Sequence, residues 1–387
     1  MLSPANLVEF LNSGSNILLA LSADNAVPVA IANLLAEIDI SLSPERTSLV
    51  VDHFNYDTSS ASEKHDVLLI PASKSKAAVK NFFDIPGTIA FPRAVGQVLG
   101  NASPLLAPVL KAPSTAYTYN PKSEDGEAIE DVFASGSQIS LVSAFQARNS
   151  ARFTVLGSAE SLEDKWFDAS VQAPSTKAAT KTANKAFAAA LTAWTFKEVG
   201  VLRVGEVQHY LNEGAQKGVT NTSSSISSPL DLNPTIYRIK NEVHYSIALS
   251  EWTHDHWAPF TPPAGDSVQL EFSMLSPFHR LNLKPSGTTD DATVFSAEFK
   301  LPDQHGIFNF FTEYRRPFYT NVEEKRTVTV RHFAHDEWPR SFVISGAWPW
   351  ISGIWVTVAG WLAFVCLWLY SKPSSAKVDL KIGGGKR

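Results

Sequence analysis

The sequence is poor in cysteine, in excess charge of either sign and in recognisable catalytic motifs. Its 387 residues contain one cysteine, Cys366, which excludes an intramolecular disulfide, a cysteine-based zinc cage and an iron–sulfur cluster. The formal net charge is −5, from 38 acidic and 33 basic residues, so there is no broad basic field for nucleic acid. We therefore predict no nucleic-acid partner.

The motifs GxGxxG, GxxxxGK[ST], GxSxG and HExxH are all missing from the sequence. We accordingly predict no catalytic, cofactor-binding or metal-ligating residues. One alternative stays open, because Asp52–Asp57 (DHFNYD) follows a predicted strand, and open α/β sheets bind ligands at the carboxyl ends of their strands. The alternative function is a ligand-binding or enzymatic domain that uses a cleft near these residues. We favour the interpretation that the polar side chains organise a turn.

A second polar cluster, His254-Asp255-His256, lies between two tryptophans. Two imidazoles on one strand face could serve a metal, but no further ligands are apparent in the sequence. We interpret this segment as a solvated hairpin loop.

A long apolar run near the C-terminus is the most informative segment. Trp350–Tyr370 carries no charged residue, and at ~1.5 Å per residue it is long enough to span the hydrocarbon layer of a bilayer. We predict a transmembrane helix over residues 348–371. Gly353 and Gly360 share one face of it with Thr357 nearby, and small residues on one face let a partner helix approach closely.

The charges after this run predict its orientation. Residues 372–387 contain five basic residues and one acidic residue, and short basic flanks stay in the cytosol. We therefore expect a cytosolic tail and a luminal or extracellular bulk. Residues 1–30 show no signal peptide, so we expect the sequence to lack its true N-terminus, including a cleaved signal. A tail-anchored cytosolic protein is the alternative.

The residues before this run divide into two patterns. In residues 1–199, short apolar strands alternate with helical stretches such as Ala26–Ala36, Ser73–Phe83 and Thr176–Glu198, which predicts an α/β layered domain with a largely parallel sheet. Residues 200–345 alternate without a convincing helix, which predicts an all-β sandwich of about seven strands. Two sequons, at Asn101 and Asn221, are candidate N-glycosylation sites.

Several segments of the sequence together carry a resemblance to one family. They are Val51–Asp57, Phe145–Arg152, Trp194–Gly205, Gln269–Phe272, Phe299–Asp303 with Gly306–Phe308, and Arg331–Trp350. They resemble the beta, or 48-kilodalton, subunit of the oligosaccharyltransferase complex. The resemblance is collinear from about residue 4 to the tail. Family members carry a signal peptide and further strand–helix units before the segment that matches Ser3–Leu21. The resemblance therefore implies that this sequence is truncated at its N-terminus.

The resemblance also implies a fold and a function. It implies a luminal α/β domain of flavodoxin- or amidotransferase-like type, incomplete at its N-terminus, then a β-sandwich and one membrane helix. The implied function is that of a non-catalytic structural and assembly subunit in the endoplasmic reticulum membrane. The implied partners are the catalytic multi-spanning subunit, a ribophorin II-type subunit, a small DAD-type subunit and membrane lipid.

Overall fold

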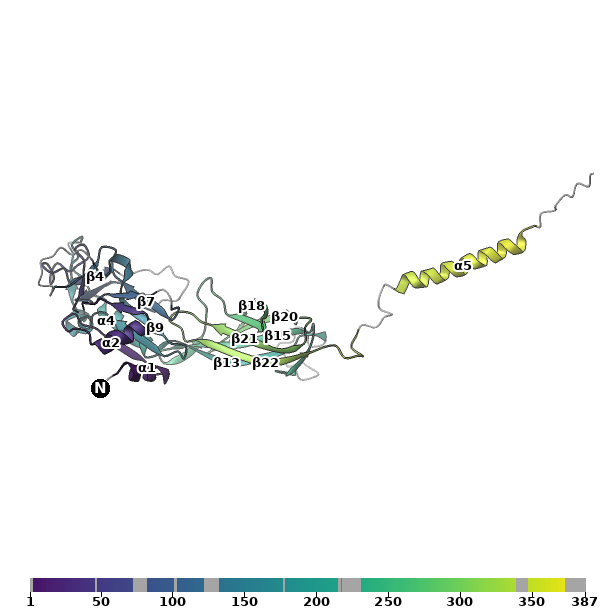
Figure 1. The fold of residues 1–387 in the computed structure, drawn as a ribbon, viewed down its shortest axis with the longest axis horizontal. Coiled ribbons are helices and arrows are strands. Elements are labelled where there is room, and N and C mark those ends of the chain that lie inside the picture. The colour runs from purple at the N-terminus through teal and green to yellow at the C-terminus, as the bar shows by residue number, and fades with distance from the viewer. Residues whose placement is uncertain are drawn as a thin grey trace, which may run out of the picture. The chain divides into compact units, whose positions relative to one another are not determined.

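The computed structural model describes residues 3–45, 47–71, 82–100, 103–121, 132–176, 178–214, 217, 231–338 and 347–372. The chain divides into two compact units, Met1–Arg331 and His332–Arg387 (Figure 1). The described sheets all belong to the first unit, and helix α5 belongs to the second.

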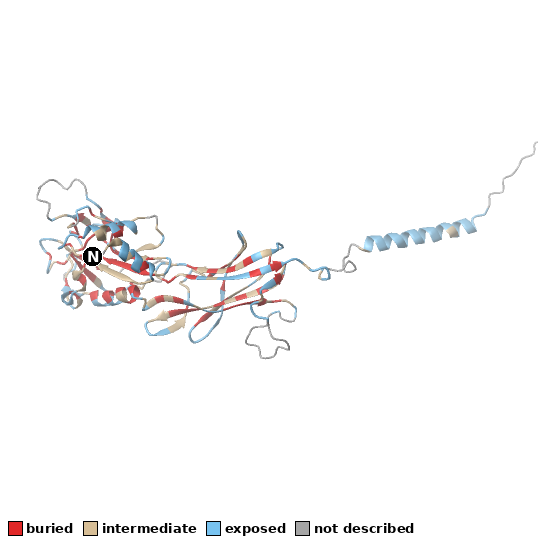
Figure 2. Cartoon of the chain, turned by 60° about the horizontal axis from the view of Figure 1, so that its bottom comes forward, coloured by how far each residue is buried: buried red, intermediate tan, exposed pale blue. Residues whose placement is uncertain are grey.

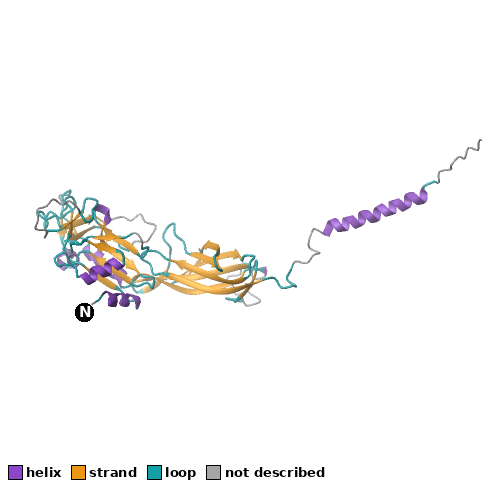
Figure 3. Cartoon of the chain, viewed as in Figure 1, coloured by secondary structure: helices purple, strands orange, loops and turns teal. Residues whose placement is uncertain are grey.

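Residues 3–198 form short strands interspersed with helices (Figure 3). The helices are α1 (Pro4–Asn12), α2 (Val29–Glu37), α3 (Asp164–Phe167) and α4 (Asn184–Thr195). The strands are β1 (Ile17–Ala20), β2 (Ile40–Leu42), β3 (Leu49–Val51), β4 (Val67–Pro71), β5 (Thr88–Pro92), β6 (Gln97–Leu99), β7 (Leu106–Lys111), β8 (Tyr117–Tyr119), β9 (Ile139–Gln146), β10 (Arg152–Leu156), β11 (Ser170–Val171) and β12 (Thr180–Lys181).

The main sheet of this region has the order β1-β10-β9-β6-β2, with β7 also paired to β9. Within it β1 and β10 run parallel, while the other described pairs are antiparallel. The expectation of a largely parallel sheet is therefore wrong for the described strands. The physical reason is the short connection 147–151 between β9 and β10, since parallel neighbours need a crossover of about a dozen residues or more.

Helices cover both faces of this sheet. On one face Phe187, Leu191 and Trp194 of α4 pack in a core with Leu156 of β10. On the other face, α1 and α2 pack in a second core with the alternate side chains of β10, among them Phe153. The predicted helices near Ala26–Ala36 and within Thr176–Glu198 are confirmed as α2 and α4. The predicted helix Ser73–Phe83 lies mostly outside the described residues.

Residues 199–331 form two five-stranded sheets. Their strands are β13 (Val199–Leu211), β14 (Ile236–Arg238), β15 (Glu242–Thr253), β16 (His256–Pro259), β17 (Gln269–Ser273), β18 (Pro277–Asn282), β19 (Lys284–Thr288), β20 (Thr293–Lys300), β21 (Gly306–Tyr314) and β22 (Val322–Arg331). One sheet has the order β13-β15-β20-β19 with β16 on β15, and the other has the order β14-β22-β21-β17-β18.

Aromatic side chains join the two sheets. Tyr245 of β15 stacks on Phe310 of β21 with ring centres 5.5 Å apart, and its hydroxyl lies 2.8 Å from Thr312 Oγ1. His209 of β13 stacks on the same Phe310 ring at 4.8 Å. The predicted sandwich is therefore present, with ten described strands in place of about seven. A domain boundary at residues 199–200 remains a prediction.

Helix α5 (Trp348–Tyr370) is 23 residues long, and none of its side chains is buried within the chain (Figure 2). An 18-residue stretch of this helix has a mean hydropathy of 1.8. A long helix that is apolar on all sides, with no side chain buried against the rest of the described chain, matches the transmembrane helix predicted from the sequence.

Candidate functional site

The first candidate site is the loop that follows β3. Asp52 is fully buried, and its carboxylate accepts hydrogen bonds from the backbone amides of Phe54 (2.8 Å) and Asn55 (3.2 Å). The Asn55 side-chain amide (3.0 Å) and the Thr115 hydroxyl (2.7 Å) also donate to it. Both oxygens of this carboxylate are therefore engaged in holding the loop.

Asp57 at the end of the loop is saturated in the same way. Its carboxylate accepts hydrogen bonds from the backbone amides of Gln172 (2.8 Å) and Ser60 (3.0 Å) and from the Ser59 hydroxyl (2.8 Å). Burial by itself raises the pKa of Asp57, but the hydrogen bonds from Gln172, Ser60 and Ser59 outweigh it and hold that pKa below its ordinary value. The polar side chains of the loop thus organise its turn, as interpreted from the sequence, while Thr115 and Gln172 from distant segments complete the set of donors.

The hairpin His254-Asp255-His256 lies at the turn between β15 and β16, where all three side chains are exposed. His256 Nδ1 lies 2.6 Å from the Asp255 carboxylate, and this hydrogen bond lowers the pKa of Asp255. The structure agrees with a solvated hairpin loop.

A buried arginine lies where residues 3–198 meet residues 199–331, which are the two halves of the first unit. Arg152 of β10 is fully buried, and its guanidinium donates to the backbone carbonyls of Trp194, Val199 (2.8 Å) and Gly200 (2.8 Å). Desolvation lowers the pKa of Arg152 to about 9. The guanidinium therefore ties the end of α4 and the start of β13 to the sheet through carbonyl oxygens.

The loop 315–321 between β21 and β22 closes the same junction. Its contacts with the first half include Trp194 Nε1 donating to the Phe318 carbonyl (2.8 Å), Gln146 Nε2 to the Tyr319 carbonyl, and Asn321 Nδ2 to the Arg148 carbonyl (3.2 Å). Its Thr320 amide donates to the carbonyl of Gly200 in β13 (3.0 Å). Gly200 is required here, because it has φ +69° and an added Cβ would lie 2.6 Å from the Phe318 oxygen. Segments far apart in the sequence thus form one continuous junction.

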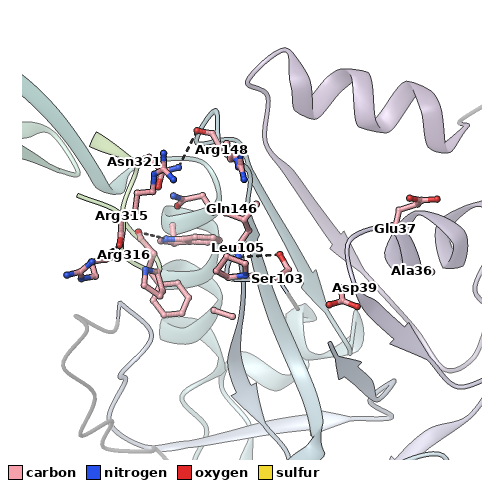
Figure 4. Close-up of a pocket in the computed structure, with 16 residues that line it drawn as sticks. Ala36, Glu37, Asp39, Ser103, Leu105, Gln146, Arg148, Arg315, Arg316 and Asn321 are labelled. Atoms are coloured by element: carbon pink, nitrogen blue, oxygen red, sulfur yellow. Dashed lines mark hydrogen bonds between the residues drawn. The ribbon is translucent and has the colours of Figure 1, made fainter. Parts of the chain in front are cut away.

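A cleft of about 770 Å³ opens beside this junction (Figure 4). Arg148, Arg315 and Arg316 lie towards one end of it, and Glu37 and Asp39 towards the other. Arg316 makes two hydrogen bonds to Asp266, at 2.6 and 2.8 Å, so its charge is compensated. The lining residues in the described part of the chain include no histidine, cysteine or lysine, and hence no pairing of a nucleophile with such a base.

The residues predicted to form a packing face lie on helix α5, and the face itself remains a prediction. Apart from the helix's own backbone and the chain neighbours, no atom lies within 4 Å of a Cβ added at Gly353 or Gly360, and the Thr357 hydroxyl donates to the Gly353 carbonyl at 2.9 Å. Thr357 therefore satisfies its own polar group within the helix, as a side chain in lipid must. The sequons at Asn101 and Asn221 lie outside the described residues.

Two comparisons with known proteins agree with each other. The sequence model described as "OST48, N-terminal domain" matches residues 1–198, and the one described as "OST48 middle domain" matches residues 220–372. The dolichyl-diphosphooligosaccharide–protein glycosyltransferase subunit wbp1 of Schizosaccharomyces pombe is 33% identical over 379 residues, which cover 97% of this chain and 79% of that protein.

The 48 kDa subunits with the same enzyme name are similar over the same extent. The Arabidopsis thaliana protein is 30% identical over 96% of this chain and 78% of its own length, and the Caenorhabditis elegans protein is 33% identical over 97% and 78%. Near-complete coverage at these identities, together with two successive domain matches, shows that the chain belongs to the OST48 family.

Proposed function

We propose that this chain is a non-catalytic structural subunit of the oligosaccharyltransferase complex, which N-glycosylates proteins in the endoplasmic reticulum. One observation carries the proposal: relatives named as subunits of this glycosyltransferase match between 95% and 97% of the chain. The chain is therefore a subunit of a glycosyltransferase complex and not an enzyme on its own.

The chemistry of the described residues supports a structural role. The carboxylates of Asp52 and Asp57 are occupied by loop hydrogen bonds, so neither presents an oxygen to a substrate proton. The alternative of an enzymatic cleft near Asp52–Asp57 is not favoured. The two halves of the first unit are instead joined by many hydrogen bonds. Such a junction suits a subunit that keeps its shape within an assembly.

The chain crosses the membrane once, through α5. The basic residues of 372–387 stay in the cytosol by the positive-inside rule, which makes residues 1–345 luminal. Within the luminal part, an α/β domain spans residues 1–199 and a β-sandwich domain spans residues 200–345. The end of the first family match at residue 198 supports that boundary.

The partners are other subunits of the complex. The small-residue face at Gly353, Thr357 and Gly360 packs against a helix of a partner subunit. Lipid gives no hydrophobic driving force for helix association, so van der Waals contact at close backbone approach must supply the attraction. The partner subunits are the catalytic multi-spanning subunit, the ribophorin II-type subunit and the small DAD-type subunit.

Topology and assembly can be tested together in microsomes. With the orientation above, protease added to intact microsomes removes only the tail, and Asn221 or Asn101 is the site of any attached glycan. Purification in mild detergent should recover the catalytic subunit with the chain. A large domain digested in intact microsomes, or a pure preparation of this chain that transfers glycan alone, contradicts the proposal.

A further inference from the structure

Two histidines that are twelve residues apart in sequence meet beside the Asp52–Asp57 loop. The imidazole rings of His53 and His65 are arranged edge to face, with ring centres 4.7 Å apart, and Nδ1 of one faces Nδ1 of the other. His53 is exposed and His65 is half-buried, so solvent reaches the pair. In the sequence, His53 stands out only as part of Asp52–Asp57, and nothing there marks His65 as its neighbour in space.

Neighbouring rings orient the two imidazoles. His53 Nε2 lies 2.9 Å from the hydroxyl of Tyr117 on β8, and the Tyr56 ring packs against His65 at a tilt of 34° with ring centres 4.0 Å apart. When Nε2–H donates to Tyr117, the lone pair of His53 Nδ1 points at His65. A histidine whose second nitrogen is held by a hydrogen bond is the usual arrangement of a metal ligand.

The backbone beneath the pair is fixed by its own contacts. His65 has φ +51°, a left-handed conformation that residues other than glycine seldom adopt. Its amide donates to the Ala61 carbonyl at 3.0 Å, and its carbonyl accepts from the Asp52 amide at 3.3 Å. The saturated Asp52 carboxylate holds the other side of the loop. Asp52 is thus a positioning residue for His53, and the unusual backbone of His65 is maintained by two hydrogen bonds.

From this geometry we propose that His53 and His65 bind a divalent transition-metal ion, with Zn²⁺ as the reference ion. Neutral imidazole is the preferred nitrogen donor for Zn²⁺, Cu²⁺ and Ni²⁺. Among the residues that the structure describes, no three His, Cys, Asp or Glu side chains gather as a full ligand set. The other coordination positions are therefore taken by water, and the ion is exchangeable. The competing state is a hydrogen bond from one Nδ1 to the other, without metal.

The test is a Zn²⁺ titration of the full chain in detergent micelles, prepared without a polyhistidine tag and followed by calorimetry and thermal unfolding. We expect one saturable site, a higher Tm with Zn²⁺, and tighter binding of Cu²⁺ than of Zn²⁺. His53→Ala and His65→Asn should each weaken Zn²⁺ binding by about tenfold or more, asparagine being tolerant of the left-handed backbone. Tyr117→Phe should weaken it by about tenfold through the lost orienting hydrogen bond.

The histidine pair of the β15–β16 hairpin offers a matched control. His254→Ala with His256→Ala removes two exposed imidazoles from the β15–β16 hairpin and should leave Zn²⁺ binding unchanged. A Zn²⁺ site that survives the loss of both His53 and His65, or that disappears with the hairpin pair, overturns the proposal. So does a wild-type chain that binds no Zn²⁺.

A second measurement keeps the test valid if a variant fails to fold. In the wild-type chain, bound Zn²⁺ should protect His53 and His65 from acylation by diethylpyrocarbonate, read by mass spectrometry, while His254 and His256 stay reactive. Equal reactivity of all four with and without Zn²⁺ contradicts the proposal. Neither outcome bears on membership of the glycosyltransferase complex.

Discussion

The guanidinium of Arg152 lies 4.7 Å from the centre of the Trp194 indole ring while it donates a hydrogen bond to the Trp194 backbone carbonyl. Arg152 thus contacts both the ring and the main chain of Trp194. Because the indole Nε1–H donates to the Phe318 carbonyl, the pair links β10, α4 and the loop between β21 and β22. The junction between the two halves of the first unit depends on this contact.

Replacement of Arg152 by methionine should destabilise the junction strongly. The substitution keeps a long apolar stem but leaves buried carbonyls at Trp194 and Val199 without this donor, so we expect the free energy of unfolding to fall by about 2–5 kcal/mol. Thermal unfolding of the detergent-solubilised chain measures the effect.

The control for this substitution is Arg203→Met. Arg203 also lies over a tryptophan, Trp257 at 4.2 Å, but its side chain is 43% exposed and pairs with Asp291 at 3.3 Å. We expect its loss to cost no more than about 1 kcal/mol. Equal effects of the two substitutions would show that the buried carbonyl contacts of Arg152 contribute nothing.

Asp57→Asn should separate a structural role from a catalytic one. The amide keeps the size of the side chain but turns one acceptor oxygen into a donor. That donor faces either the Gln172 amide at Oδ1 or the Ser60 amide at Oδ2, which we expect to cost about 1–3 kcal/mol of stability. Glycosylation per assembled complex should stay unchanged. Loss of glycosylation at normal assembly and protein level, for this variant or for Asp52→Asn, would instead establish the enzymatic alternative.

His209 should make the β-sandwich sensitive to acid. Burial, with a smaller contribution from Arg326, lowers the pKa of His209 to about 4. Below the ordinary histidine value of about 6.5, the unfolded chain binds a proton that the folded chain does not, so stability is present above that pH and is lost as the pH falls towards 4. We expect a loss on the order of 2 kcal/mol across this window in urea unfolding.

A paired substitution tests the source of this pH dependence. His209 Nδ1 lies 2.8 Å from the Tyr237 hydroxyl, so His209→Phe combined with Tyr237→Phe removes both partners and leaves neither polar group buried alone. The double variant should lose most of the slope between pH 6.5 and 4. An unchanged slope would assign the acid sensitivity to other groups.

Gly360→Leu should weaken assembly of the complex if the small-residue face packs against a partner helix. The added side chain blocks close backbone approach, and we expect reduced recovery of partner subunits in mild detergent. Ala359→Leu is the matched control, since it adds a similar volume about 100° away around the same helix. Equal recovery with the two variants would place the contact on another face.

The helices were predictable because their signals are local. The apolar side chains of α4 recur at helical spacing, and the left-handed backbone that ends the helix falls on Lys197, just after the C-cap Phe196. Strand direction was not predictable in this way. The short loop between β9 and β10 makes that pair antiparallel, yet residues 139–145 and 152–156 read equally well as members of a parallel sheet, because an apolar strand carries no signal of its direction.

The candidate site was visible in sequence only in part. Asp52–Asp57 stands out as a polar run after a strand, but Thr115 and Gln172, which occupy its carboxylates, lie more than fifty residues away. Around His53, Tyr117 is equally distant in sequence, and His65 lies twelve residues away on the far side of the loop. Spacing along the chain does not identify such partners, because only the packing of separate strands brings them within hydrogen-bond distance.

The sequence by itself determined that residues 348–370 are long and apolar enough to span a membrane and that the chain belongs to one family, since both follow from composition and order along the chain. Only the tertiary structure decided what the polar residues do. The carboxylates of Asp52 and Asp57 accept hydrogen bonds that hold their loop. Arg152 is buried and donates to backbone carbonyls, and the His53 ring contacts the His65 ring. The physical reason is that a polar group's role depends on burial and on its partner, and both are properties of contacts between distant segments.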